Sequence, residues 1–206
     1  MAPTFIDSFP HQWQAEILPT RPAILPARHF VYPRDAEEIE RGALEVLIRP
    51  YPQPLPDANP SQQAKLADLE REAEPFLATC ALGFRDPAVP TGLWSTPRPV
   101  EICAVSGGYA YLIDTTAPER FTMIPYRPVV EILPAARQNL LLFVGHRAIL
   151  AWGPDGEAWQ SERLSSEGVT LAAIEDGVLR GMGWDWMSDK ETPFALELRT
   201  GLRIAI

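Results

Sequence analysis

The amino-acid sequence predicts a mainly β protein with a minor α component, an α+β fold in which an antiparallel β-meander is covered by one amphipathic helix and a proline-rich N-terminal arm. Three observations predict this fold. Apolar residues follow period two from residue 98 to residue 206, as they do in strands. Tight-turn dipeptides such as Gly107-Gly108 separate the apolar runs. Eleven of the 22 prolines fall within residues 1–60, where they exclude long helices.

The arm is expected to span residues 1–58 of a single domain that covers residues 1–206. Prolines punctuate residues 1–34 and hold their neighbours in extended geometry. Large apolar side chains such as Trp13 and Phe30 lie between these prolines, so we expect the arm to pack over the main body. A polyproline II segment that binds a partner is the alternative.

Two regular elements are expected inside this arm. Asp35 can cap a short helix that ends at Gly42, because Glu38 stands three residues after the cap. Residues 43–49 alternate in polarity, which indicates a strand. The prolines of residues 50–60 then predict a loop.

Residues 59–83 are expected to form the covering helix. Its apolar face recurs with a spacing of three to four residues, at Leu66, Leu69 and Ala73. Pro75 ends or kinks this helix, and the apolar face continues to Gly83. A proline-rich connection over residues 84–99 follows.

The meander is expected to fill residues 98–206. Its strands are predicted at 100–106, 109–114, 121–124, 129–133, 140–144, 148–152, 158–163, 169–174, 178–183, 194–198 and 202–206. Further turns are predicted at Gly145-His146, Asp155-Gly156 and Asp176-Gly177. Three successive hairpins of similar pattern suggest propeller-like units, although a closed propeller needs at least four blades. A sandwich and an open barrel fit the pattern equally well.

Composition and charge bear on partners and location. The formal net charge of −9 weighs against nucleic acid and against an anionic membrane surface, and it favours a basic protein partner. The N-terminal residues lack the pattern of a secretory signal, and no apolar run approaches the length of a membrane helix. We therefore expect a cytoplasmic protein. Cys80 and Cys103 both lie in apolar patterns and are expected to be buried thiols. The oligomeric state does not follow from the sequence.

No nucleotide-binding, hydrolase or metal-site motif is present, so we expect neither a cofactor nor a metal. His146 stands at a predicted hairpin tip, where it is either a base or an ordinary polar turn residue. Asp185, Asp189 and Glu191 form an acidic cluster that could hold a hard cation, although a solvated acidic loop is the simpler interpretation.

The segment from Gly183 to Glu191 is the candidate ligand-binding region. It places Trp184 and Trp186 beside Asp185, and aromatic faces next to carboxylates can bind a sugar ring or an apolar ligand. The same tryptophans could instead fill the core of a small β protein. Gly181 and Gly183 are expected to make the start of this loop flexible.

Three stretches of the chain carry a resemblance to an uncharacterised bacterial protein family of unknown function. They are residues 75–83, residues 141–152 and residues 193–201, within a likeness that spans most of residues 30–201. The resemblance implies no activity, cofactor or site residue.

Three functions fit these observations. The first is a non-catalytic protein-binding domain, of the inhibitor or immunity type, that binds a basic partner. The second is a small-ligand or carbohydrate-binding module built on Trp184, Asp185 and Trp186. The third is a hydrolase that uses a pair of carboxylates. An exposed apolar patch would favour the first, an aromatic-lined cleft the second, and carboxylates that share a pocket the third.

Overall fold

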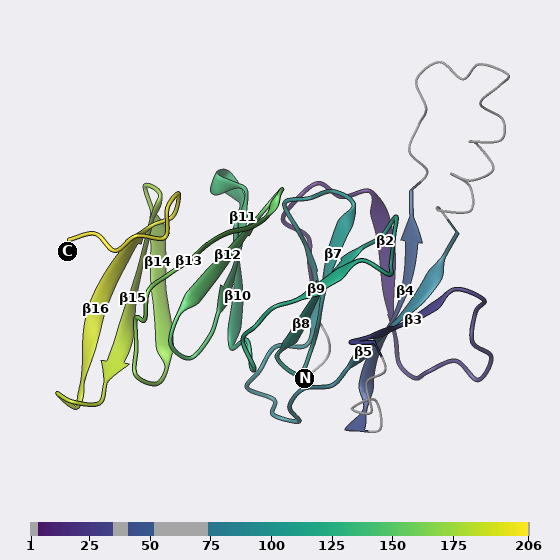
Figure 1. Cartoon of the computed structure of the whole chain (residues 1–206), viewed down its shortest axis with the longest axis horizontal. Coiled ribbons are helices and arrows are strands. Elements are labelled where there is room, and N and C mark those ends of the chain that lie inside the picture. Colours follow the sequence, from purple (N-terminus) through teal and green to yellow (C-terminus); the bar gives the residue numbers. More distant parts are fainter. Residues whose placement is uncertain (1–3, 35–40, 52–73, 206) are drawn as a thin grey trace, which may run out of the picture.

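The computed structural model describes residues 4–34, 41–51 and 74–205, and in these residues four β-sheets stand in a row along the long axis of the molecule (Figure 1). Sheet I has the strand order β2 (Trp13–Leu18), β4 (Ala43–Pro50), β5 (Phe76–Ala81) and β3 (His29–Tyr32). Sheet II has the order β1 (Thr4–Ile6), β6 (Gly92–Ser95), β7 (Glu101–Ser106), β8 (Tyr109–Asp114) and β9 (Phe121–Met123).

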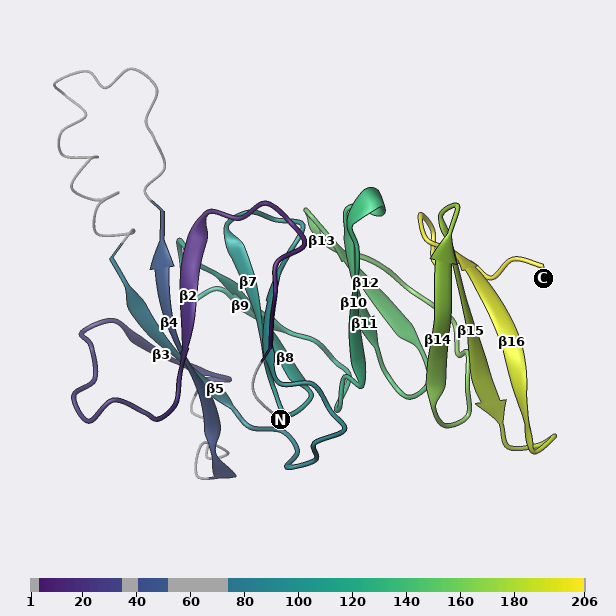
Figure 2. The ribbon, with the colours of Figure 1, turned by 180° about the vertical axis from the view of Figure 1, so that it is seen from behind.

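The chain continues through the other two sheets in sequence order. Sheet III contains β10 (Glu131–Ala135), β11 (Leu140–Val144), β12 (Ile149–Gly153) and β13 (Gly156–Gln160), with a 3-10 turn at Ala136–Gln138. Sheet IV contains β14 (Val169–Glu175), β15 (Val178–Asp185) and β16 (Lys190–Glu197). Seen from either side, sheets I and IV lie at opposite ends of the row (Figures 1 and 2).

Three apolar interfaces hold the row together, one between each pair of neighbouring sheets. In β7, Ile102 and Ala104 pack toward sheet I, whereas Cys103 and Val105 pack toward sheet III. The same alternation recurs in β11, whose residues divide between the interface with sheet II and the interface with sheet IV. Successive side chains of a strand point to opposite faces, so a sheet between two others must be apolar at every position.

The prediction of a covering helix is wrong. The described residues contain no α-helix, and Phe76–Ala81, which the sequence analysis assigned to that helix, form strand β5 with all six residues buried. Neighbouring sheets, and not a helix, cover the faces of sheets II and III. Residues 59–73, which include Leu66, Leu69 and Ala73, lie outside the described residues, as does most of the short helix expected from Asp35.

The N-terminal residues take part in the sheets through three strands. β1 pairs in parallel with β6, β2 pairs antiparallel with β4, and β3 pairs in parallel with β5. Segments far apart in the sequence therefore complete sheets I and II. The stretch expected as a connection, residues 84–99, contains strand β6, which the sequence analysis missed.

The prediction of an all-β region with antiparallel pairing after residue 98 is confirmed, but the last strand expected at residues 202–206 is wrong, because the described residues 202–205 make only an isolated bridge between Arg203 and Leu196. The turn Gly107-Gly108 joins β7 to β8, and both glycines have positive φ angles of 56° and 77°. Consecutive meanders stacked face to face resemble propeller blades in their order, but the row stays open at both ends (Figure 1). In the part of the chain that the structure describes, no helix has the length and apolar character needed to cross a bilayer.

The two-sided burial of sheet III makes a direct prediction for β11. Leu141 faces sheet II, its neighbour Leu142 faces sheet IV, and both are completely buried. Leu141→Ala and Leu142→Ala should therefore each lower the free energy of unfolding by about 2–5 kcal/mol, measured by urea denaturation. If either substitution lowered the free energy of unfolding by less than about 1 kcal/mol, the corresponding face of sheet III would be in contact with solvent and the prediction would be wrong.

Candidate functional site

The segment selected from the sequence is the hairpin that joins β15 to β16 at one end of sheet IV. Asp185 and Lys190 form the last strand pair, and the four residues between them make the turn. Asp189 closes the turn with a φ of 55°, the left-handed conformation that ends many four-residue hairpin loops. Trp184 lies opposite Glu191, so these two side chains share one face of the hairpin.

The turn presents two large apolar side chains to solvent. Trp186 is 71% exposed and Met187 is 82% exposed, whereas Trp184, one residue before Asp185, is about one-third exposed. Trp186 belongs to the turn and not to strand β15. In an extended strand, Trp184 and Trp186 would point to the same face, but this rule does not apply across the turn. We call residues 184–189 the hairpin tip.

Asp185 orders the hairpin tip from within. Its Oδ1 atom accepts a hydrogen bond of 3.3 Å from the backbone N–H of Met187, and Oδ2 accepts bonds from the backbone N–H and the hydroxyl of Ser188, at 3.3 and 2.6 Å. These bonds, the one from the Ser188 hydroxyl above all, lower the pKa of the Asp185 carboxyl. Both carboxylate oxygens therefore hold the turn, and Asp185 acts as a turn-capping residue.

The structure brings the turn that contains His146 close to the hairpin tip through the loop of residues 164–168. The His146 carbonyl accepts a 2.9 Å bond from the Gly168 N–H, and Trp184 exchanges backbone bonds with the same loop, receiving one of 2.7 Å from the Ser166 N–H. The backbone N–H of Trp186 donates a hydrogen bond of 3.4 Å to the Ser166 hydroxyl. His146 itself is exposed. Asp189 and Glu191 are exposed too, so the residues selected from the sequence gather at one end of sheets III and IV.

Gly181 and Gly183 are packing residues and not hinges. Both are buried in strand β15. A Cβ atom on Gly181 would overlap the Phe194 ring, and one on Gly183 would overlap the Leu164 carbonyl oxygen. The absence of a side chain at these positions lets β16 and the loop of residues 164–168 approach β15 closely, which fixes the base of the hairpin.

A second candidate region, which the sequence analysis missed, lies at the edge of sheet II beside β8 and β9. Glu101 begins β7 and Asp114 ends β8, and the two residues are directly paired across the hairpin. They line an open pocket of about 380 Å³ with Arg98, Arg120 and Arg34. The two-residue turn at Gly107-Gly108 sets this register, so the pairing of Glu101 with Asp114 could have been deduced from the sequence.

The two carboxyl groups of this pocket have different surroundings. Asp114 accepts bonds at Oδ1 from Thr116 and Ala117, and its Oδ2 atom lies 3.1 Å from Arg120 and 3.5 Å from Arg98. The carboxyl of Glu101 accepts a 2.8 Å bond from the Trp152 indole N–H. Burial raises the pKa of Glu101, against the opposing effect of its hydrogen bonds and of Arg98. Asp114 thus holds a turn and contacts two arginines, whereas Glu101 is buried and has a raised pKa.

A third polar group lies on the outer face of sheet I. The Thr79 hydroxyl donates a 2.6 Å bond to the buried Glu45 carboxylate and lies 2.8 Å from His29 Nε2. Because the hydroxyl has a single proton, which Glu45 accepts, His29 must donate from Nε2. Burial and the Arg21 charge lower the pKa of His29. These hydrogen bonds pair the side chains of Glu45, Thr79 and His29 with one another, so the group needs no ligand to satisfy them.

Within residues 4–34, 41–51 and 74–205, no group of histidine, cysteine or carboxylate side chains is arranged to hold a metal ion. Cys80 and Cys103 are buried and unpaired with each other, and burial raises the pKa of both thiols above their ordinary range. Comparison of the chain with known protein families, with curated proteins and with solved structures finds no match.

The raised pKa of Glu101 predicts how the stability of the protein depends on pH. A group whose pKa is higher in the folded state contributes stability that is present at low pH and is lost as the pH rises through the folded pKa. Glu101→Gln keeps the acceptor for Trp152 but cannot ionise. The free energy of unfolding of this variant, relative to the native protein, should therefore rise between pH 4 and pH 9 in urea denaturation. A difference that stays constant over this range would contradict the assignment.

Proposed function

We propose that this protein is a non-catalytic binding domain that docks a basic protein partner through the hairpin tip. The observation that carries the proposal is the exposure of Trp186 and Met187 on a turn whose shape Asp185 fixes. Tryptophan is enriched among the residues that dominate binding energy at protein interfaces, and methionine adapts to irregular apolar surfaces. Contiguous exposed apolar surface that is rimmed by polar residues marks interaction sites, and the two side chains are adjacent on this turn.

The order of the hairpin tip favours binding. Holding a loop in its bound conformation before the partner arrives lowers the entropy cost of association. The Asp185 bonds and the contacts of Trp184 with the loop of residues 164–168 provide such order here. Since a single tryptophan buries about 150–250 Å² and a stable interface about 800 Å² per side, the interface must extend beyond the tip. The exposed face that carries Trp184 and Glu191 is continuous with it.

Charge supports a basic partner. Residues 184–191 contain three carboxylates, Asp185, Asp189 and Glu191, against the single ammonium group of Lys190. The whole chain has a formal net charge of −9. A partner with a positive rim around an apolar pocket would be attracted over long range and oriented by this field.

The other two functions have less support. In a sugar-binding module, carboxylate oxygens are needed to bind hydroxyl groups, but both oxygens of Asp185 are occupied by the turn. Trp184 and Asp185 also point to opposite faces of strand β15. In a hydrolase with two carboxylates, Asp114 would have to attack or activate water, yet Thr116, Ala117 and two arginines already engage both of its oxygens.

The proposal predicts that binding depends on the hairpin tip and is sensitive to salt. The native protein, the double variant Trp186→Ser/Met187→Ser and the control Ile24→Ser are immobilised and exposed to an extract of the source cells at about 50 mM and 500 mM salt. Ile24 is 88% exposed in the connection between β2 and β3, so its replacement changes exposed apolar area elsewhere. A basic protein should be retained by the native protein and by Ile24→Ser, and released at high salt.

Affinity measured by calorimetry with that purified protein should fall about 30-fold or more in the double variant, as expected for interface residues that dominate binding. The free energy of unfolding of the double variant should change by less than about 0.5 kcal/mol, because both side chains are exposed. A retained protein that binds the double variant with unchanged affinity would refute the assignment of the hairpin tip, and an acidic partner would refute the role of charge.

A further inference from the structure

The pocket at the edge of sheet II gathers three arginines in an otherwise acidic protein. Arg34 follows strand β3 of sheet I, Arg98 lies between β6 and β7, and Arg120 lies between β8 and β9. Residues from distant parts of the sequence therefore meet at one opening. The pocket has a volume of about 380 Å³, which falls in the range of small-molecule sites.

Each of the three arginines has N–H donors beyond those that contact the described residues. A guanidinium group carries five N–H donors in a planar fork. Arg98 and Arg120 each contact Asp114 Oδ2 through one nitrogen, Nη2, and Arg34 donates from Nη2 to the Glu119 carbonyl at 2.7 Å. Among the described residues these are the contacts of the three guanidinium groups. The side chains of Arg98 and Arg120 are half-exposed to mostly exposed, so their other N–H groups are open to a ligand.

Asp114 fixes the positions of Arg98 and Arg120 but contacts only one nitrogen of each guanidinium group. Its Oδ1 atom is engaged by the turn that follows β8, which fixes the carboxylate, and its single remaining oxygen is shared by both arginines. The pocket is lined by the three arginines and by three acidic side chains, Glu101, Asp114 and Glu119, of which Asp114 contacts Arg98 and Arg120 directly. Glu101 is also buried in the pocket wall, where burial raises its pKa, and its carboxyl accepts the bond from the Trp152 indole N–H.

The walls of the pocket limit the rest of the ligand. Leu112 and Phe121 contribute apolar surface, and Thr122 contributes a hydroxyl group. A ligand that fits has a compact body and one group with two or three oxygens that can accept from planar guanidinium forks. Carboxylate and phosphate groups have this geometry, and arginine binds them through paired hydrogen bonds.

We propose that this pocket binds a small molecule through one oxyanion group, a carboxylate or a phosphate, which Arg98 and Arg120 hold while Asp114 fixes their positions. The ligand takes the outward N–H donors of both arginines, and Arg34 adds a third positive charge at the opening. This site is separate from the hairpin tip, since none of the pocket residues belongs to sheet IV.

The test measures binding of inorganic phosphate and of succinate to the full chain by isothermal titration calorimetry, at constant ionic strength kept with chloride. Intrinsic tryptophan fluorescence, to which Trp152 contributes through its bond to Glu101 in the pocket wall, gives a second readout. We expect saturable binding of at least one of the two probes at millimolar concentration. Stronger binding of phosphate or of succinate identifies which oxyanion the pocket prefers.

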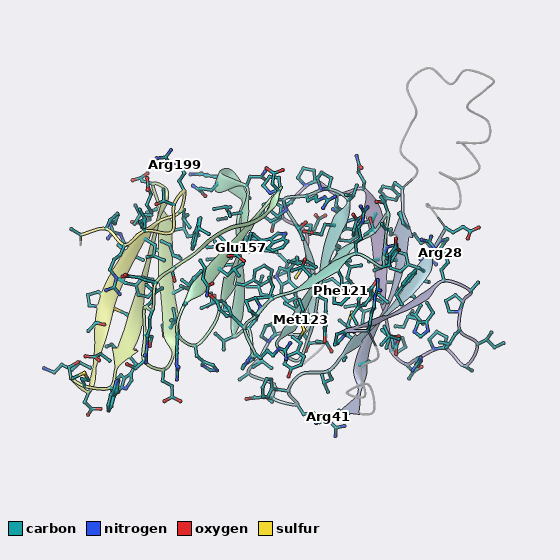
Figure 3. The ribbon with its side chains drawn as sticks, viewed as in Figure 1. Arg28, Arg41, Phe121, Met123, Glu157 and Arg199 are labelled. Carbon is teal, nitrogen blue, oxygen red and sulfur yellow. The ribbon has the colours of Figure 1, made fainter. Side chains whose placement is uncertain are left out.

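Arg98→Gln and Arg120→Gln should each weaken that binding by about tenfold or more, the loss expected when a hydrogen bond to a charged group is removed. The matched control is Arg199→Gln. Arg199 lies 3.8 Å from a carboxylate oxygen of Glu197, as the pocket arginines lie near Asp114, and it stands at the sheet IV end of the molecule, away from the pocket residue Phe121 (Figure 3). This control should bind the probe with unchanged affinity.

Far-UV circular dichroism establishes that each variant is folded, and Arg120→Lys provides a further variant that keeps the charge but loses the planar fork. It should bind more weakly than the native protein and more tightly than Arg120→Gln. Binding of neither probe up to about 10 mM would overturn the proposal, because the expected dissociation constants are millimolar or lower. Equal affinity of the native protein and the two glutamine variants would also overturn it.

Discussion

The burial of both faces of sheets II and III is the constraint on which the rest of the structure depends. Every residue of β7 and β11 is buried, so these strands contribute to an apolar interface on each side. Charged groups are then confined to strand ends, sheet edges and the outer faces of sheets I and IV. Glu101 and Asp114 form the last pair at the open end of the β7–β8 hairpin. The hairpin tip joins β15 to β16 at the end of sheet IV where Asp185 pairs with Lys190. Both candidate regions occupy places where the stacking leaves room for polar or exposed side chains.

The two regions suit different kinds of ligand for a physical reason. The hairpin tip exposes apolar surface on a turn ordered by Asp185, and such a surface gains free energy when a matching partner removes it from water. The pocket offers unused guanidinium donors near buried carboxyl groups, and directional donors of this kind recognise an oxyanion. Because the regions lie on different sheets and share no residue, their energetic effects should be independent.

The net charge of the chain describes neither region by itself. A formal charge of −9 favours basic partners at long range. At the pocket, however, Arg34, Arg98 and Arg120 bring three guanidinium groups together, which the sum over the chain conceals. Direct contacts and burial at each place, and not the sum over the chain, decide which ligand is bound.

The sequence by itself determined most strands and the tight turns after residue 98, though not the expected strand at residues 202–206, because period-two patterns and glycine-containing turns are local signals. It also singled out Trp186, but it left open whether the indole ring is exposed or fills the core. The layer that covers each sheet was decided only by the tertiary structure. A short apolar run such as Phe76–Ala81 is equally compatible with a buried helix and with a strand buried on both faces, since its composition records burial but not the identity of the neighbour. The meeting of Arg34 with Arg98 and Arg120 likewise depends on how sheet I packs on sheet II, which no local pattern encodes.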